Sequence, residues 1–428
     1  PYPWQAGHMN QTLDFLDFLA ASPSSYHAAR VVADRLIDAG FALQDETDPW
    51  DAGPGGHVLV RGGAVMAWWV PEDASPDSGF RIIGSHTDSP GFTLKPGPAL
   101  SSAGWSQANV EVYGGPILAS WLDRELTFAG RVVLGDGSVR LVDTGPVARI
   151  PHLAIHLDRS KELELDRQQH MQPVLGLVGE GHTPVLDLVA EKAGVEKQDI
   201  DGFDLITCDT QPGQVFGADA ELIAAGRMDN LTSVHASLVA LLHAVESGDT
   251  GDDVLVLAAF DHEEVGSAST TGAAGPILED VLARTAAALG ADLDATRRMY
   301  ARSTCVSADA AHSVHPNYVG KHDPGHHPLI GAGPVVKINA NQRYASTADT
   351  VARWQRACRA AAVPSQSFVS NNAMPCGSTI GPITATRLGI PTVDVGVPLL
   401  SMHSARELAG VQDQLWFAEA LEAYLIGS

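Results

Sequence analysis

The sequence of 428 residues has few cysteines, few basic residues and no long apolar run, and each shortage excludes a class of protein. Its four cysteines form no C-x-x-C pair, so we expect no disulfide framework and a reduced, cytoplasmic location. The 27 Lys and Arg residues are outnumbered by 51 Asp and Glu residues, which gives a formal net charge of −24. Such a surface repels nucleic acid and anionic membranes, so neither is expected as a partner. No apolar run approaches the ~20 residues of a membrane-spanning helix.

The remaining composition is that of an ordinary globular protein. Apolar residues make up 45% of the chain and charged residues 18%, which is close to the average for folded domains. At about 150 residues per domain, the length allows two or three domains. A chain of this size buries a large core, so it requires no metal or disulfide merely to fold.

The two ends of the chain alternate helical and strand-like segments. Residues 254–260 form a continuous apolar run, which is typical of a parallel strand covered on both faces. Apolar residues recur with helical spacing in several other segments. These patterns predict helices over 13–19, 26–37, 230–246, 277–289 and 415–426, and strands over 65–70, 81–84, 254–260, 304–308 and 392–396.

The middle of the chain has a different pattern. Polar and apolar residues alternate there, and Asp136-Gly137 lies between β-rich flanks, which is a strong signal for a hairpin over 131–142. The acidic stretch 185–201 is predicted to form a helix at the surface. This part of the chain therefore reads as a β-rich domain.

We predict an α/β protein whose main domain is interrupted by this β-rich insertion. The main domain is expected to contain a mostly parallel mixed sheet flanked by helices. Its two parts are predicted at residues 9–91 and 217–428, and the β-rich domain at residues 92–216.

Ionisable side chains cluster where predicted strands end. In open α/β sheets, ligands bind beyond the carboxyl ends of the strands, because loops and helix N-termini converge there. Taken alone, each cluster also has a simpler explanation, such as a capped turn, a helix N-cap or a solvated loop. Asp229 stands instead at the mouth of the predicted helix 230–246. The other members of the clusters are His86, Asp88, Glu263, Glu264, Asp309 and His403.

Taken together, the clusters predict a centre for two divalent metal ions. They offer nitrogen and oxygen ligands without a thiol, a set that Zn²⁺, Co²⁺ and Mn²⁺ all accept. Glu263 is left over, and a spare glutamate beside metal ligands can act as the general base toward a metal-activated water. Gly266 stands where an H-E-x-x-H motif requires histidine, so the helical zinc-protease site is excluded. The five expected ligands are His86, Asp229, Glu264, Asp309 and His403.

The chain resembles the aspartyl aminopeptidases, the M18 family of cocatalytic zinc exopeptidases. The resemblance covers nearly the whole chain, and the motifs that carry it are long. The matching stretches are residues 22–28, 84–91, 120–124, 149–156, 261–267, 309–318, 337–339, 342–344, 376–382 and 402–404.

The resemblance implies a role for each residue of the clusters. Asp229 would bridge the two metal ions. His86 and Asp309 would complete one metal site. Glu264 and His403 would complete the other. Glu263 would be the general base, and Asp88 would be the partner of His86.

The resemblance also implies a substrate and an assembly. Family members remove an N-terminal Asp or Glu from peptides, so a peptide with an acidic first residue is the expected substrate. The β-rich insertion would be a dimerisation domain that carries His156 into the active site of a neighbouring subunit, and the dimers would assemble into a tetrahedral dodecamer. The candidate substrate-binding residues are His156, Lys337, Tyr344, Gly377 and Ser378.

Two alternatives stay open at this point. The same two-metal site could serve an aminopeptidase of broad specificity, or one that prefers neutral residues. A non-catalytic shell protein that keeps metals for stability is the other alternative, although such a protein needs no spare base like Glu263. Without the family context, Lys337 is expected to be a solvated surface residue.

Overall fold

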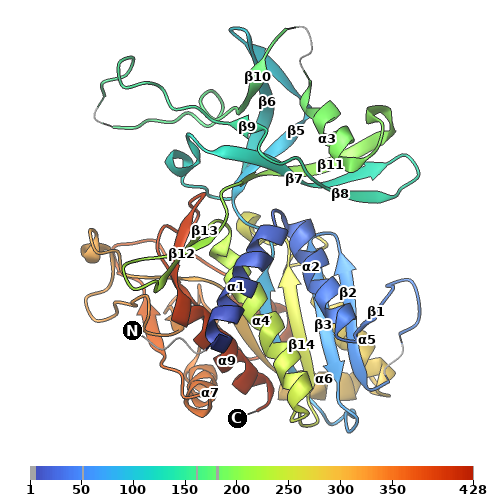
Figure 1. Ribbon diagram of the computed structural model, residues 1–428. Coiled ribbons are helices and arrows are strands. Elements are labelled where there is room, and N and C mark those ends of the chain that lie inside the picture. The colour runs from blue at the N-terminus through green and yellow to red at the C-terminus, as the bar shows by residue number, and fades with distance from the viewer. Residues whose placement is uncertain (1–5, 51–52, 161, 180–182, 428) are drawn as a thin grey trace.

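A computed structural model of the chain describes residues 6–50, 53–160, 162–179 and 183–427. The chain forms two bodies, one above the other in Figure 1, and the larger one contains both ends of the described chain. None of the described helices combines the length and the hydropathy needed to cross a bilayer. The four cysteine thiols are free.

The larger body is built on a nine-stranded mixed sheet. The neighbouring pairs β1–β2, β14–β4, β4–β15, β15–β19 and β17–β18 are parallel, and the other three are antiparallel. This arrangement confirms the predicted mostly parallel mixed sheet. The strands, in spatial order, are β1 (Ala42–Leu43), β2 (Gly55–Arg61), β3 (Ala64–Val70), β14 (Val254–Phe260), β4 (Phe80–His86), β15 (Thr304–Ala308), β19 (Thr392–Gly396), β17 (Val335–Ile338) and β18 (Gln366–Val369).

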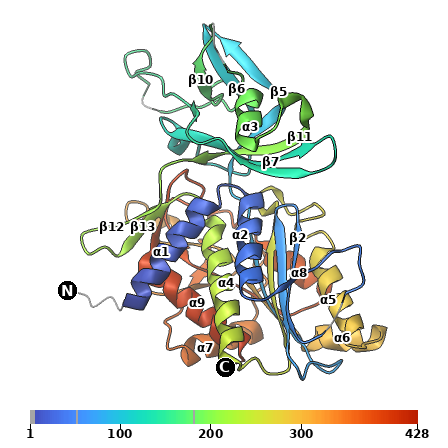
Figure 2. The same cartoon turned by 45° about the vertical axis from the view of Figure 1, so that its right-hand side comes forward.

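Helices cover both faces of this sheet, as Figure 2 shows. Every residue of the central strand β14 is buried because its side chains alternate between two apolar cores, one under each helical layer. The first layer consists of α1 (Ala6–Ala21), α2 (Ser25–Asp38), α4 (Met228–Ser247), α7 (Ala348–Ala360) and α9 (Val411–Leu425), and the second of α5 (Ile277–Ala288), α6 (Leu293–Arg302) and α8 (Ile380–Leu388).

The smaller body is an antiparallel β-barrel with its own apolar core. A seven-stranded sheet closes on itself because β11 pairs with both β5 and β7. The helix α3 (Val185–Ala193) packs against it. The strands are β5 (Gly91–Ser102), β6 (Trp105–Tyr113), β7 (Glu125–Leu134), β8 (Val139–Asp143), β9 (Ala148–Arg149), β10 (Val174–Leu177) and β11 (Ile200–Asp209).

Two smaller sheets complete the fold near the carboxyl edge of the large sheet. One contains β12 (Gln214–Phe216), β13 (Leu222–Ala225) and β21 (Glu407–Gly410), and the other pairs β16 (Ala311–His312) with β20 (Pro398–Leu399). Their strands flank the segments that contain Asp229, Asp309 and His403.

Two local predictions in the β-rich part had different outcomes. The hairpin over 131–142 is confirmed, since β7 and β8 pair in antiparallel register across the Asp136-Gly137 turn. The helix predicted over 185–201 was wrong in length. It ends at Ala193 because Gly194 adopts a left-handed conformation with φ 68°, and the chain then continues into β11 at Ile200.

Leu257 provides a test of the sheet's central packing. The side chain is 1% exposed on β14. We expect Leu257→Ala to lower the free energy of unfolding by about 2–5 kcal/mol, because it removes buried methyl groups and leaves a cavity. Denaturant unfolding of both proteins would measure the difference. Leu293→Ala is the control, since Leu293 is 76% exposed, and an equal loss in both variants would contradict the described packing.

Candidate metal centre

Segments from distant parts of the sequence converge beyond the carboxyl ends of the central strands. His86 is the last residue of β4, Asp309 follows β15, and Asp229 lies in the first turn of α4. Glu263 and Glu264 form the short 3-10 helix η3 (Glu263–Val265) after β14, and His403 lies between β20 and β21. Potential ligand atoms lie within 4.8 Å of one another in three groups: His86, Asp229 and Asp309; Asp229, Glu264 and His403; and His86, Glu263 and Glu264.

Asp229 belongs to two of these groups, as His86 and Glu264 also do, and each of its two oxygens lies near a histidine. Its Oδ1 atom lies 3.5 Å from Nε2 of His86, and its Oδ2 atom lies 3.3 Å from Nε2 of His403. The same Nε2 atom of His403 is 3.4 Å from Oε2 of Glu264. The two oxygens of one carboxylate therefore face two different imidazoles, which is the arrangement that a bridging ligand requires.

Both histidines turn the same nitrogen toward this centre. Nδ1 of His86 lies 3.0 Å from the carbonyl oxygen of Asp88, and Nδ1 of His403 lies 3.0 Å from that of Gly115. A carbonyl oxygen can only accept a hydrogen bond, so each Nδ1 atom must carry hydrogen. In the neutral ring the lone pair is then on Nε2, where it can bind a metal ion.

The donor set fits divalent cations. Oδ1 of Asp229 and Oε1 of Glu264 are buried and have no hydrogen-bond partner among the described residues. Buried carboxylate oxygens are costly unless a charge or a hydrogen bond compensates them. Imidazole and carboxylate ligands without sulfur suit zinc and similar metals.

The carboxylates and imidazoles shift one another's pKa values strongly. Burial by itself would lower the pKa of His403, but its contacts with Asp229 and Glu264 raise it to about 10. The pKa of His86 is raised for the same reason, against the effect of its burial, by Asp229 and Asp88. Burial raises the pKa of Glu263 to about 8 and that of Glu264 well above its usual value. In the protein without metal, protons on the imidazoles and on the glutamates therefore offset the negative charge of the cluster.

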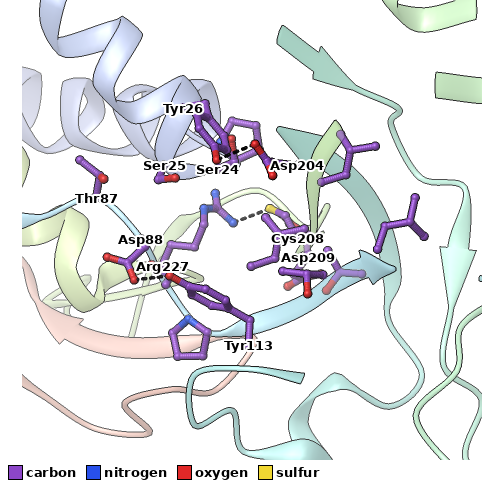
Figure 3. A pocket seen from close by; sticks show the side chains of 18 of the residues that line it. Ser24, Ser25, Tyr26, Thr87, Asp88, Tyr113, Asp204, Cys208, Asp209 and Arg227 are labelled. Carbon is purple, nitrogen blue, oxygen red and sulfur yellow. Dashed lines mark hydrogen bonds between the residues drawn. The ribbon is translucent and has the colours of Figure 1, made fainter. Parts of the chain in front are cut away.

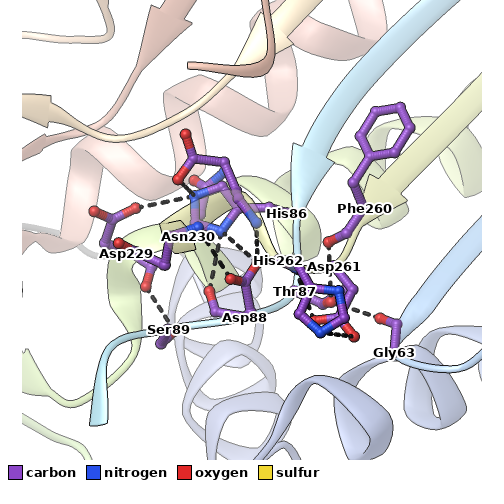
Figure 4. Close-up of polar contacts among 12 residues, drawn as sticks. Gly63, His86, Thr87, Asp88, Ser89, Asp229, Asn230, Phe260, Asp261 and His262 are labelled. Atoms are coloured by element: carbon purple, nitrogen blue, oxygen red, sulfur yellow. Dashed lines mark hydrogen bonds and ion pairs between the residues drawn. The ribbon is translucent and has the colours of Figure 1, made fainter. Parts of the chain in front are cut away.

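Asp88, which Figure 4 shows beside His86, fixes the backbone of the two glutamates. Its Oδ1 and Oδ2 atoms accept hydrogen bonds from the main-chain amides of Glu263 and Glu264, at 3.0 and 3.1 Å. Its Oδ1 atom also lies 3.4 Å from Nδ1 of His86. The hydroxyl of Tyr113, at the end of β6, donates to Oδ2 at 2.7 Å. Asp88 thus orients a histidine and the glutamate pair at once.

Four of the five candidate substrate-binding residues line the same cavity as the acidic cluster. This cavity has a volume of about 510 Å³, and Lys337 is the one Lys or Arg among its described lining residues. The expectation of a solvated lysine was wrong, because Lys337 is 2% exposed. Its Nζ atom donates to the carbonyl oxygen of Ala310 at 3.1 Å and lies 3.4 Å from Oδ1 of Asp309. The other three residues are Tyr344, Gly377 and Ser378.

His156 lies elsewhere. It is in an exposed turn between β9 and β10 of the barrel and does not line this cavity. Within one chain, the structure therefore does not bring His156 together with the other candidates.

A second cavity, of about 360 Å³, lies behind the acidic cluster, between the two bodies. Figure 3 shows Asp88 and Tyr113 on one side of it and Tyr26 with Asp204 on another. Arg227 donates to Sγ of Cys208 across part of this space. Asp229 lines both cavities, so this residue is part of the wall that separates them.

Sequence reasoning missed Glu407, which is buried beside the cluster. Its carboxylate accepts hydrogen bonds from the amides of Asp229 and His403. Burial and the charge of Asp229 raise the pKa of Glu407 to about 8. The sequence offered one sign of this residue: Glu407 is a single acidic residue four positions after His403, and it begins a short apolar segment. That segment is strand β21 in the structure.

Comparisons with known proteins show the M18 family that the sequence resembles. A family model described as "Aminopeptidase I zinc metalloprotease (M18)" matches residues 18–425. A "Probable M18 family aminopeptidase 2" of Streptomyces coelicolor is 50% identical over 435 residues, covering 99% of both chains.

Solved structures are similar over nearly the whole chain. One is described as the complex of Ape4 and Nbr1, with 35% identity, a TM-score of 0.96, and coverage of 100% of this chain and 87% of the other. The mApe1 dodecamer of S. cerevisiae is 26% identical with a TM-score of 0.86, covering 98% of this chain and 97% of the other.

Metal binding should release protons. The raised pKa values keep His86 and His403 protonated at pH 7 without metal, whereas a metal ion needs a free Nε2 lone pair. We expect Zn²⁺ binding at pH 7 to release at least one proton per chain. The apparent affinity should increase as the pH rises toward 10, because protons then compete less. Calorimetric titration in buffers of different ionisation enthalpy measures both quantities, and binding without proton release would contradict the described electrostatics.

Proposed function

Because this chain belongs to the M18 family of zinc metalloaminopeptidases, we propose that it hydrolyses the N-terminal residue of peptides, preferably Asp or Glu, at a centre of two metal ions. The observation that carries this proposal is the shared carboxylate of Asp229, whose two oxygens face His86 and His403. Four nitrogen and oxygen ligands around this one bridging residue match the needs of a pair of divalent cations.

The groups of neighbouring atoms suggest how the ligands divide. His86 and Asp309 join Asp229 around one position, and Glu264 and His403 join Asp229 around the other. Two divalent ions, Zn²⁺ by family and Co²⁺ or Mn²⁺ by ligand chemistry, would be held there. Bound ions of this kind polarise a carbonyl group and lower the pKa of a water molecule.

Glu263 is the proposed general base. Its Oε2 atom lies 3.8 Å from Nε2 of His86, and its backbone is held by Asp88. Burial raises its pKa to about 8 in the protein alone, and two dications nearby would favour the ionised form that accepts a proton. Glu263 would take the proton from water and return it to the leaving amine. Asp88 would keep Glu263 and His86 oriented for this step.

The acidic cavity also explains why the substrate would need a free amine. Glu264 and Asp309 line it together with Glu263, so a positively charged α-amine finds compensating charge there. A blocked N-terminus would leave buried carboxylates without that partner. This supports removal of single N-terminal residues rather than cleavage within a chain.

Lys337 is the proposed recognition group for an acidic first side chain. It is the cationic residue of the cavity besides the histidines, and its ammonium group lies 5.2 Å from the ring of Tyr344. Gly377 and Ser378 would contribute polar backbone groups beside them. The contact of Lys337 with Asp309 also favours a second candidate function, an aminopeptidase of broad or neutral specificity, because this lysine already has a carboxylate partner.

We also propose that the barrel is a dimerisation domain within a homo-oligomer. The loop between β9 and β10 exposes four large apolar side chains, a feature typical of interaction surfaces. The domains would be residues 9–91 and 217–428 for catalysis and residues 92–216 for assembly. His156, on this loop, would then reach a neighbouring active site, and a dodecamer like that solved for mApe1 is the proposed assembly. The exposed side chains are Leu153, Ile155, Leu157 and Leu163.

Adjacent glutamates provide a matched pair of variants. Glu263→Gln should keep both metal ions but lose about 10²–10⁴-fold in kcat, because it removes the base and not a ligand. Glu264→Gln should instead lose metal. Activity on Asp, Glu and Leu peptides after metal removal and reloading, together with metal analysis, separates the two effects. Full turnover by Glu263→Gln would exclude Glu263 as the base. If the wild-type protein binds metal and assembles but hydrolyses none of these peptides, the alternative of a non-catalytic shell protein is correct instead.

Lys337→Met tests the acidic preference. We expect the ratio of kcat/KM for N-terminal Asp over N-terminal Leu to fall by at least about 10-fold, which corresponds to about 1.4 kcal/mol of lost recognition. Peptide amides that differ only in the first residue would measure this ratio. Lys192→Met, at an exposed position on α3, is the control. An unchanged ratio, or a wild-type enzyme that prefers Leu, favours the neutral or broad specificity instead.

A further inference from the structure

We infer that Glu407 is a positioning residue, whose buried carboxylate holds the main chain of Asp229 and His403 where a pair of metal ions would bind. The inference rests on the proposed two-metal centre and adds a residue outside its ligand set. Glu407 itself is neither a ligand nor a base in this proposal.

The geometry assigns one oxygen of Glu407 to each segment. Oε2 accepts a hydrogen bond from the amide of Asp229 at 3.0 Å, and Oε1 accepts one from the amide of His403 at 2.8 Å. The side chain is 2% exposed. Within the described part of the chain, no ion pair with a basic side chain compensates it, so its hydrogen bonds are to the backbone. A buried carboxylate of this kind is costly unless such hydrogen bonds satisfy it.

Both tethered segments need an external partner. His403 has φ 68° and Ser401 has φ 57°, and this left-handed region is unfavourable for residues other than glycine. The amide of Asp229 lies in the first turn of α4, where main-chain amides have no partner within the helix. Glu407 supplies a partner to both, and it lies 178 positions from Asp229 in the sequence.

Asp88 holds main-chain amides on the other side of the cluster in the same way as Glu407. Asp88 accepts the amides of Glu263 and Glu264 with its two oxygens, just as Glu407 accepts those of Asp229 and His403. Two buried carboxylates thus tether the backbone of four residues of the centre.

The chain offers a matched control in Asp413. This carboxylate is also fully buried, and its two oxygens accept the amides of Gly331 and Gly333 at 2.6 and 2.8 Å. Neither glycine lines the proposed metal cavity. Replacement of Asp413 by Asn therefore disturbs the same kind of tether at a place without ligands.

Glu407→Gln tests the inference. The amide keeps one acceptor oxygen but places an NH₂ group against the second main-chain N–H. We expect the affinity for at least one of two Zn²⁺ ions to fall by about 10–100-fold, the usual effect of losing a group that orients metal ligands. Chelator competition would measure this affinity, and the absorption bands of the Co²⁺-loaded protein would report altered ligand geometry. Asp413→Asn should lower thermal stability and leave affinity and bands unchanged.

The outcomes separate this inference from the proposed function. If the wild-type protein itself binds no pair of ions, the two-metal centre is wrong. If the wild type binds two and Glu407→Gln binds them with equal affinity and an unchanged Co²⁺ spectrum, the positioning role is wrong. An equal loss of affinity in Asp413→Asn also overturns it, because the effect would then be general destabilisation.

A measurement on the wild-type protein covers the case in which Glu407→Gln does not fold. Hydrogen exchange of the metal-free protein should show slow exchange for the amide of His403, although it lies in a loop, and for the amide of Asp229. Rapid exchange at both amides would contradict the inference without any variant.

Discussion

The constraint on which this site depends is the compensation of buried negative charge. Asp88, Asp229, Glu263, Glu264 and Asp309 lie close together beyond the central strands. Among the described residues, the basic side chains that pair with them are those of His86, His403 and Lys337. Carboxylates at this density cannot all be ionised unless cations or hydrogen bonds offset their charge. The raised pKa values of both imidazoles and of the two glutamates are direct consequences. Divalent cations would replace the protons that otherwise balance this cluster.

Main-chain amides share that compensation with the side chains. Asp88 and Glu407 each accept two backbone N–H groups, and each pair of amides belongs to residues of the cluster. The same hydrogen bonds that satisfy a buried carboxylate therefore also set the direction of neighbouring side chains. This coupling holds loops from distant parts of the chain in a common geometry.

The sequence predicted the members of the cluster better than their surroundings. Strand-end placement pointed to His86, Glu264, Asp309 and His403, because a period of apolar residues marks strands and polar residues mark their ends. Asp229 was indicated by its place at the start of the predicted helix 230–246. The same logic could not predict Glu407. Its function depends on which backbone amides it meets, and that is decided by the pairing of β21 with β13 rather than by any local pattern.

The burial of Lys337 and the turn of the backbone at Gly194 likewise could not be predicted from the residues next to them in the sequence. Lys337 is covered because β17 lies beside β19 inside the sheet, whereas lysine as a residue type favours the surface. The helix predicted over 185–201 ends before Gly194, where the backbone turns. The acidic composition, on which the prediction rested, continues beyond that turn. The α/β class and the β-rich insertion were predictable since both follow from the period of apolar residues over many segments.

The position of the inserted barrel has a consequence for the site. The chain leaves the large sheet at His86 and enters the barrel at Gly91, so Asp88 lies on the connection itself. The barrel then returns Tyr113 to Asp88, while Gly115 and Ile117 contact His403, the latter through its amide and the His403 carbonyl oxygen at 2.9 Å. Segments of the acidic cluster at both sides of Asp229 are thus held partly by the barrel. A displacement of the barrel relative to the sheet would change the hydrogen bonds of Asp88 and His403 together, which links the geometry of the acidic cluster to the domain that we propose for assembly.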